Sequence, residues 1–206
     1  MAKNVGIFIF DEVEILDFSG PYEVFSRTRT TPGIESRKNN ESAPFNVFTI
    51  SKKLKTIQVS GGLKVLADYN FKDSPKVDIL LIPGGQGTRP LLQSKETISW
   101  ILGTAKEASL LTSVCTGSLL LARAGLLRNK KATTHWGALD LLKNISPSTK
   151  ILRDQRVVDD GIITSAGVSS GIDMAFQVVA KLFGDHIATD TAKYIEYRRT
   201  DKTLPG

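Results

Sequence analysis

The sequence predicts an α/β protein in which a mostly parallel central sheet lies between two layers of helices. Apolar segments of strand length alternate along the chain with longer segments whose apolar residues recur at helical spacing. The strand-like segments are almost entirely apolar, which is typical of parallel strands buried on both faces. A length of 206 residues favours one domain covering residues 1–206. We therefore expect a flavodoxin-like three-layer sandwich.

The strands are expected where short apolar runs end at turn-forming residues. The five main candidates are Val5–Phe10, Phe45–Ile50, Val77–Ile82, Leu110–Val114 and Ile162–Ser165. A shorter pair on either side of Gly61 and Gly62 is expected to form a hairpin from Thr56–Val59 and Leu63–Ala67.

Helices are expected after most of the main strands. The candidates are Pro21–Arg29, Lys95–Ala108, Gly117–Ala124, Ala138–Asn144, Gly171–Phe183 and Asp185–Arg198. Proline favours the first turn of a helix, so the first helix is expected to begin at Pro21 with Ser19 or Gly20 as its cap. This interpretation leaves Asp17 in the preceding loop.

Two segments lie outside the alternating pattern. Residues 30–44 are rich in serine, asparagine, proline and charged residues, and strands resume directly after them, so a surface insertion is expected. Residues 201–206 are expected to form a frayed tail.

Composition narrows the possible partners. The formal net charge is +6, but the basic residues are scattered and no nucleic-acid-binding motif organises them, so we expect no nucleic-acid partner. The first apolar run is too short for a signal sequence or a membrane span, so no membrane partner is expected. A single cysteine excludes an internal disulfide, which favours a reducing, cytoplasmic location.

Cys115 is the strongest candidate functional residue. It lies between an apolar strand and a predicted helix, and Gly117 follows two residues later. This spacing is typical of a nucleophile elbow, a tight turn that presents the nucleophile above the sheet. The helix N-terminus is expected to lower the thiol pKa and to supply N–H groups to a developing negative charge. The alternative is an unreactive cysteine in the core.

A glycine-rich loop after the third main strand reaches the same predicted edge of the sheet, where α/β proteins bind ligands. It contains Gly84 and Gly85, and the N–H of Gly85 could face the N–H of Thr116 to form an oxyanion hole. A plain turn is the alternative interpretation.

Asp17 is the third candidate. It lies between Leu16 and Phe18, and a carboxyl group between apolar residues is often buried, with an altered pKa. The alternative is that Asp17 caps the helix predicted to begin at Pro21.

Several motifs occur together in a characteristic order. They are Ile82-Pro-Gly-Gly85, Thr112-Ser-Val-Cys-Thr-Gly-Ser118, Gly125-Leu-Leu127, Ala132-Thr-Thr-His-Trp136 and Gly171-Ile-Asp173. Together they resemble the ThiJ/PfpI superfamily of class I glutamine amidotransferase-like proteins, and most closely its isonitrile (isocyanide) hydratase branch. The resemblance runs from Val5 to about Tyr197. Its central part also resembles the N-terminal domain of AraC-type regulators.

The resemblance implies a role for each matching residue. Cys115 would be the nucleophile and Asp17 the acid/base group. The residues implied to donate backbone hydrogen bonds or to line the pocket are Gly84, Gly85, Thr116, Gly167 and Val168. The resemblance further implies a small-molecule substrate, a homodimer, and no metal or organic cofactor.

Two residues help to choose among branches of the superfamily. Thr116 stands where the peptidase-like branch has a histidine, which disfavours a Cys-His mechanism. Asp17 stands where glyoxalase-like and deglycase-like members have a glutamate, which favours the hydratase branch. His135 lies near a motif, beside Trp136, and a structural role is favoured for it over a catalytic one.

The implied reaction is the hydration of an isocyanide to an N-substituted formamide through a thioimidate on Cys115, with Asp17 acting first as acid and then as base. One alternative is a glyoxalase-like hydrolase of aldehyde adducts. Another is a non-enzymatic ligand or redox sensor whose Cys115 oxidises. The lack of a second cysteine counts against a disulfide-forming sensor.

Overall fold

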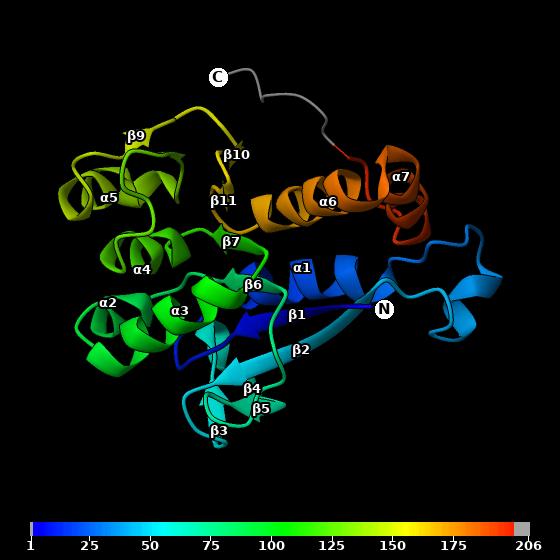
Figure 1. Ribbon diagram of the computed structural model, residues 1–206, viewed down its shortest axis with the longest axis horizontal. Helices are drawn as coiled ribbons and strands as arrows, with labels where there is room; N and C mark the ends of the chain where they lie inside the picture. The colour runs from blue at the N-terminus through cyan, green and yellow to red at the C-terminus, as the bar shows by residue number, and fades with distance from the viewer. Residues whose placement is uncertain (1, 200–206) are drawn as a thin grey trace.

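A computed structural model describes residues 2–199 and confirms the predicted α/β architecture with a mostly parallel central sheet (Figure 1). Seven strands form the sheet in the order β10-β11-β7-β6-β1-β2-β5. The strands are β1 Lys3–Phe8, β2 Phe45–Ser51, β5 Tyr69–Asn70, β6 Ile79–Ile82, β7 Leu110–Val114, β10 Val157–Asp159 and β11 Ile162–Ser165. Every neighbouring pair is parallel except β10 with β11.

Helices cover both faces of this sheet, and the central strands are therefore buried. On one face lie α1 Ile15–Arg27, α6 Ser170–Phe183 and α7 Asp185–Tyr194, which pack against one another. On the other lie α2 Thr88–Leu91, α3 Lys95–Glu107, α4 Gly117–Arg123 and α5 Leu139–Ile145. Every residue of β6 and β7 is buried, as expected for strands between two helical layers.

Two small strand pairs lie outside the main sheet. β3 Thr56–Gln58 pairs with β4 Lys64–Leu66 in the predicted hairpin, and β8 Lys131–Ala132 pairs with β9 Lys150–Ile151. Short 3-10 helices cover Glu35–Lys38, Ser60–Gly62 and Trp136–Ala138.

The first helix begins six residues earlier than the sequence predicts. α1 starts at Ile15 and contains Pro21 in its interior, so the expected start at Pro21 is wrong. Proline lacks the N–H that an interior position donates, but the apolar face of α1 is buried against the sheet and α6, and this packing outweighs the local preference. Asp17 consequently lies in the first turn of a helix instead of a loop.

The edge strand β10 was not predicted. It forms an antiparallel hairpin with β11, and the connecting turn contains Asp160 and Gly161. An Asp-Gly pair between two apolar runs is a strong hairpin signal, so β10 could have been predicted from the sequence.

Residues 30–44 contain one short 3-10 helix and are mostly exposed. They are tied to the end of α1 by Arg29, which is 2% exposed and donates hydrogen bonds to the backbone carbonyls of Ser36 and Asn39. The predicted frayed tail, residues 201–206, lies outside the described residues.

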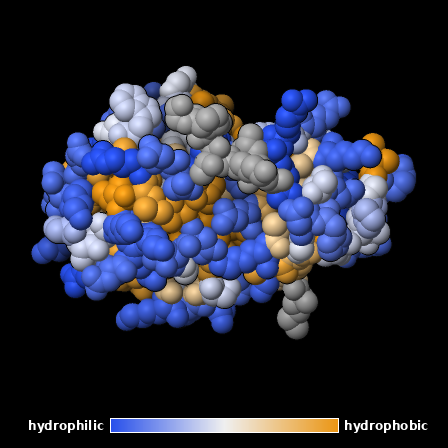
Figure 2. Space-filling model, turned by 90° about the horizontal axis from the view of Figure 1, so that it is seen from above, coloured by the Kyte–Doolittle hydropathy of each residue, from blue (hydrophilic) through white to orange (hydrophobic). Residues whose placement is uncertain are grey.

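Seen from above, much of the surface is hydrophilic, and the most extensive hydrophobic area lies left of centre, with smaller ones elsewhere on this face (Figure 2). Among residues 2–199, no helix is long and apolar enough to cross a membrane.

Candidate active site

Cys115 occupies a tight turn between β7 and α4. Its backbone adopts the left-handed conformation, with φ +56°, which is uncommon for a residue other than glycine. The Cys115 N–H donates to the carbonyls of Ser165 and Ala166, at 3.1 and 3.0 Å, and its own carbonyl accepts the Thr134 hydroxyl at 2.8 Å. These bonds hold the strained turn in place, as is typical of functional sites.

The turn also depends on Gly117. A Cβ at this position would lie 1.9 Å from the carbonyl oxygen of Ile82 at the end of β6. No side chain can occupy that space, so the glycine allows α4 to start directly against the neighbouring strand. The geometry is that of the tight strand-to-helix turn that the sequence predicts at this position.

Asp17 lies beside Cys115 and is fully buried. Its Oδ2 accepts a hydrogen bond from the Gly84 N–H at 2.9 Å. Its Oδ1 is also buried and has no partner of regular hydrogen-bond geometry among the described residues. Asp17 is therefore not a helix cap, and one carboxyl oxygen remains available for proton exchange.

The electrostatics of Asp17 suit an acid/base role near neutral pH. Burial raises the pKa of Asp17 to about 7, because the ionised form loses its hydration. The Gly84 N–H and the Cys115 thiol act in the opposite direction and favour the carboxylate, but less strongly. At neutral pH both protonation states of the carboxyl group are thus accessible.

The expected lowering of the Cys115 pKa is wrong. Burial, and next the negative charge of Asp17, raise the pKa of the thiol to about 12. The N–H groups of Thr116 and Val168 favour the thiolate, but they do not offset these two effects. The thiol can lose its proton more readily when that proton passes to Asp17, because the neighbouring negative charge then disappears.

Thr116 and Val168 provide the N–H groups that interact with the sulfur. The Val168 N–H also interacts with the Asp17 carboxyl group. Val168 has φ +47°, a conformation that strongly disfavours a β-branched residue. From the sequence, Val168 was expected only at the pocket wall and its N–H was missed, because no local sequence signal indicates a positive φ there.

Gly84 and Gly85 lie next to this group, but their N–H groups are occupied. Gly84 donates to Asp17, and Gly85 donates to the hydroxyl of Thr116 at 3.0 Å. The expected pairing of the Gly85 N–H with the Thr116 N–H as an oxyanion hole therefore does not occur in this arrangement. Gly84 serves close packing, since a Cβ would lie 2.5 Å from the Thr116 nitrogen and 2.8 Å from Asp17 Oδ2.

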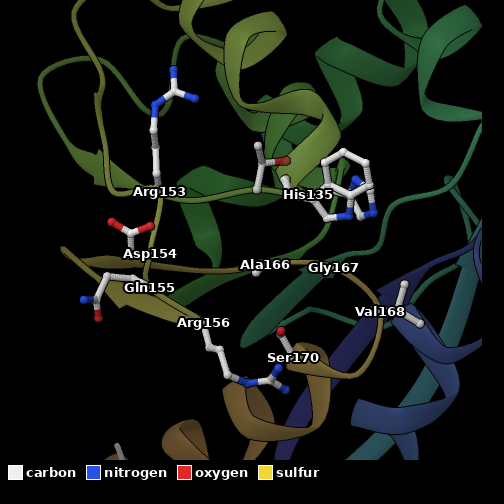
Figure 3. Close-up of a pocket in the computed structure, with 11 residues that line it drawn as sticks. His135, Arg153, Asp154, Gln155, Arg156, Ala166, Gly167, Val168 and Ser170 are labelled. Atoms are coloured by element: carbon white, nitrogen blue, oxygen red, sulfur yellow. The ribbon is translucent and has the colours of Figure 1, made fainter. Parts of the chain in front are cut away.

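A cavity of about 460 Å³ lies beside Gly167 and Val168, and neither Cys115 nor Asp17 is among its lining residues (Figure 3). Gly167 and Val168 line it together with Thr134, whose hydroxyl donates to the Cys115 carbonyl. The remaining lining residues are His135, Trp136, Arg153, Asp154, Gln155, Arg156, Ala166 and Ser170. We name this space the His135 cavity.

His135 has a structural place at the cavity wall. Its Nδ1 accepts the Gly137 N–H at 3.1 Å, and its ring lies so close to Gly167 that a Cβ there would be 2.4 Å from it. The neighbouring Trp136 side chain is 81% exposed. Within residues 2–199, no cluster of three or more histidine, cysteine or acidic side chains is arranged to hold a metal ion.

Comparison with known proteins identifies relatives along nearly the whole chain. It is 35% identical to the isonitrile hydratase of Pseudomonas putida over 196 residues, which cover 95% of this chain and 77% of the hydratase. It is 23% identical to the HTH-type transcriptional regulator GbdR of Pseudomonas aeruginosa, covering 96% of this chain and 51% of the regulator, so it spans about half the length of that relative.

The fold agrees with these relatives. A solved structure of a ThiJ/PfpI family protein from Pseudomonas syringae is 28% identical, with a TM-score of 0.83, and the match covers 100% of this chain and 78% of that one. A family model described as the DJ-1/PfpI family matches residues 3–181. This chain belongs to the DJ-1/PfpI family.

Proposed function

We propose that this protein is a cysteine-dependent lyase that hydrates an isocyanide to an N-substituted formamide. Cys115 is the nucleophile and Asp17 is the acid/base group. The observation that carries the proposal is the buried carboxyl group with a pKa near 7 in contact with the thiol of a strained turn. The 35% identity with an isonitrile hydratase supports the choice of substrate class.

In the first half of the reaction, ionised Asp17 takes the thiol proton and the sulfur attacks the terminal carbon of the isocyanide. The C–S bond forms, and the negative charge that develops on this carbon is quenched by the proton of Asp17. The product is a thioimidate with the carbon bound to sulfur, hydrogen and nitrogen. The N–H groups of Thr116 and Val168 stabilise the thiolate during this step.

In the second half, the Asp17 carboxylate takes a proton from water while the water oxygen bonds to the thioimidate carbon, and this proton passes to nitrogen. The remaining O–H proton returns through Asp17 to sulfur as the C–S bond breaks. The net change is the addition of one water molecule to the isocyanide, with the thiol and the carboxyl group restored.

The substituent on nitrogen is proposed to occupy the His135 cavity. Val168 joins the two regions, because its N–H faces Cys115 and Asp17 while the residue also lines the cavity. The cavity offers the exposed ring of Trp136 and the guanidinium of Arg156, which Asp173 holds in place through an ion pair. Substituents with an aromatic or hydrogen-bonding group suit this lining.

The test is formamide formation from cyclohexyl and benzyl isocyanide. The wild type should turn over at least one of them, Cys115→Ala should be inactive, and Asp17→Asn should lose about 100- to 10,000-fold in kcat, the usual contribution of a general acid–base group. Asp73→Asn, at an exposed carboxylate that does not line the His135 cavity, is the matched control and should leave kcat unchanged. A wild type inactive on both isocyanides but forming lactate from methylglyoxal would replace the proposal with the glyoxalase-like reaction.

A sensor function is the second candidate, because the chain also matches half of a transcriptional regulator. A sensor should bind a ligand without turning it over, or gain mass at Cys115 when treated with peroxide while converting no substrate.

We also propose that the protein is a cytoplasmic homodimer. Light scattering should then give twice the mass of one chain, and the mass of a single chain at micromolar concentration would contradict the dimer.

A further inference from the structure

A second cavity, of about 440 Å³, is lined by residues at the carboxyl ends of β1 and β2. Its lining residues are Phe8, Ile9, Phe10, Asp11, Ser51, Lys52, Lys53, Lys55, Ile57, Gly87, Pro90 and Leu91, none of which lines the His135 cavity. The carboxyl ends of parallel strands are the edge at which α/β proteins bind ligands. We name this space the lysine cavity.

The inner wall of the lysine cavity is apolar and contains two aromatic residues that are mostly buried, Phe8 and Phe10, which are 1% and 7% exposed. Phe8 and Phe10 lie with their ring centroids 5.0 Å apart, and Phe8 also packs against Phe71 and Trp100. Ile57 is buried beside them. A flat apolar group entering the cavity would contact the edge of Phe10 and the more accessible side chains of Pro90 and Leu91.

The rim carries more positive than negative charge. Lys55 pairs with Asp11 at 2.7 Å, and this lysine lowers the pKa of Asp11, so the pair is ionised and its charges cancel. Lys52 pairs with Glu96, which lies outside the cavity. Lys53 forms no ion pair with any residue from 2 to 199, so its charge is available to a ligand.

We propose that the lysine cavity binds an aryl carboxylate, with the ring against Phe10, Pro90 and Leu91 and the carboxylate at Lys53. The volume is within the range of small-molecule sites. The ligand is defined by the combination of an apolar wall and an uncompensated cation at the rim. This site is separate from the His135 cavity, because the two cavities share no lining residue.

The probe is 2-naphthoate, titrated into the ¹⁵N-labelled chain while amide signals are followed by NMR. Saturable shifts are expected at Ser51 to Lys55 and at Gly87. The uncharged analogue 2-naphthamide, which has the same ring, should bind several-fold more weakly. The charge reversal Lys53→Glu should weaken naphthoate binding by roughly tenfold, since it replaces an attraction by a repulsion at the rim.

The matched control is Lys150→Glu, which makes the same charge change on β9, away from the lysine cavity, and should leave the affinity unchanged. Cys115→Ala should also bind naphthoate normally. Equal affinities for naphthoate and naphthamide, or an unchanged affinity in Lys53→Glu, would overturn the proposal. Shifts confined to Thr116 and Val168 would do the same, since they would place the anion at the candidate active site.

Discussion

Asp17 lies against Cys115, and its negative charge adds to the effect of burial in raising the pKa of that thiol to about 12. Burial also raises the pKa of Asp17 itself, to about 7. The pair therefore holds one proton on sulfur while the carboxyl group titrates near neutral pH. In the proposed reaction, proton transfer within the pair, and not a permanently ionised thiolate, supplies the nucleophile.

Asp17→Asn should make Cys115 more reactive toward iodoacetamide, even though the variant is expected to lose turnover. Removing the carboxylate removes a charge that raises the thiol pKa, so the thiolate fraction at pH 9 should rise by about tenfold. The measurement is the alkylation rate of Cys115 by mass spectrometry between pH 7 and 10. A variant that reacts no faster than the wild type would show that the carboxylate does not hold the proton on sulfur.

Wild-type stability should fall as pH rises from about 4 to above 7, relative to Asp17→Asn. The folded-state pKa of Asp17 lies above its ordinary value of 3.8, so the folded protein binds this proton more tightly than the unfolded chain. The associated stability is fully present below pH 4 and is lost as pH passes through about 7. A shift of this size corresponds to on the order of 4 kcal/mol.

Urea unfolding at several pH values measures this difference as the free energy of unfolding of wild type minus that of Asp17→Asn. Asp140→Asn removes an exposed carboxylate and should keep the wild-type pH profile. Parallel profiles for wild type and Asp17→Asn would indicate that Asp17 keeps its ordinary pKa in the folded protein.

Gly84→Ala should reduce kcat/KM by about 100-fold. The new Cβ would lie 2.5 Å from the Thr116 nitrogen and 2.8 Å from Asp17 Oδ2, so it must push apart the carboxyl group and the turn that carries the thiol. Gly103→Ala is the control, because nothing lies within 4 Å of its Cβ and alanine favours the helix α3. Full activity in Gly84→Ala would mean that the reaction tolerates a wider separation between the Asp17 carboxyl group and the Cys115 thiol.

The turn at Cys115 was predictable because its information is local. An apolar strand, a cysteine and a glycine two residues later suffice to indicate the elbow, and the structure places Gly117 against Ile82 as that geometry requires. The family resemblance implied an acid/base role for Asp17, although Pro21 predicted a helix start that left Asp17 in a loop. The buried face of α1 overrode that signal.

The arrangement of N–H donors was not predictable, because it depends on contacts between distant segments. The Gly85 N–H is taken by a hydroxyl that comes from the β7–α4 turn, and the N–H that interacts with the thiol from the other side of the site belongs to Val168, whose φ is +47°. The predicted lowering of the Cys115 pKa was wrong for a similar reason. A helix start is visible in sequence, whereas the burial of the sulfur and the approach of Asp17 are properties of the folded chain.

Thr116 should tolerate serine better than valine, because its hydroxyl connects the turn between β7 and α4 to the loop that follows β6. This buried oxygen accepts the Gly85 N–H at 3.0 Å and lies 3.2 Å from the Thr88 hydroxyl. Thr116→Val leaves the Gly85 N–H without its acceptor, which should cost about 1–3 kcal/mol of stability. Thr116→Ser keeps the acceptor and should lose less.

The same pair of variants distinguishes the role of the Thr116 hydroxyl from the role of the Thr116 backbone N–H. Both variants keep the N–H that faces sulfur, so both should retain kcat within a few-fold, while the Thr116→Val melting temperature alone drops markedly. The measurements are thermal unfolding and isocyanide turnover for the two variants side by side. Loss of turnover in Thr116→Val at unchanged stability would assign the hydroxyl itself to the chemistry and contradict a purely structural role for that oxygen.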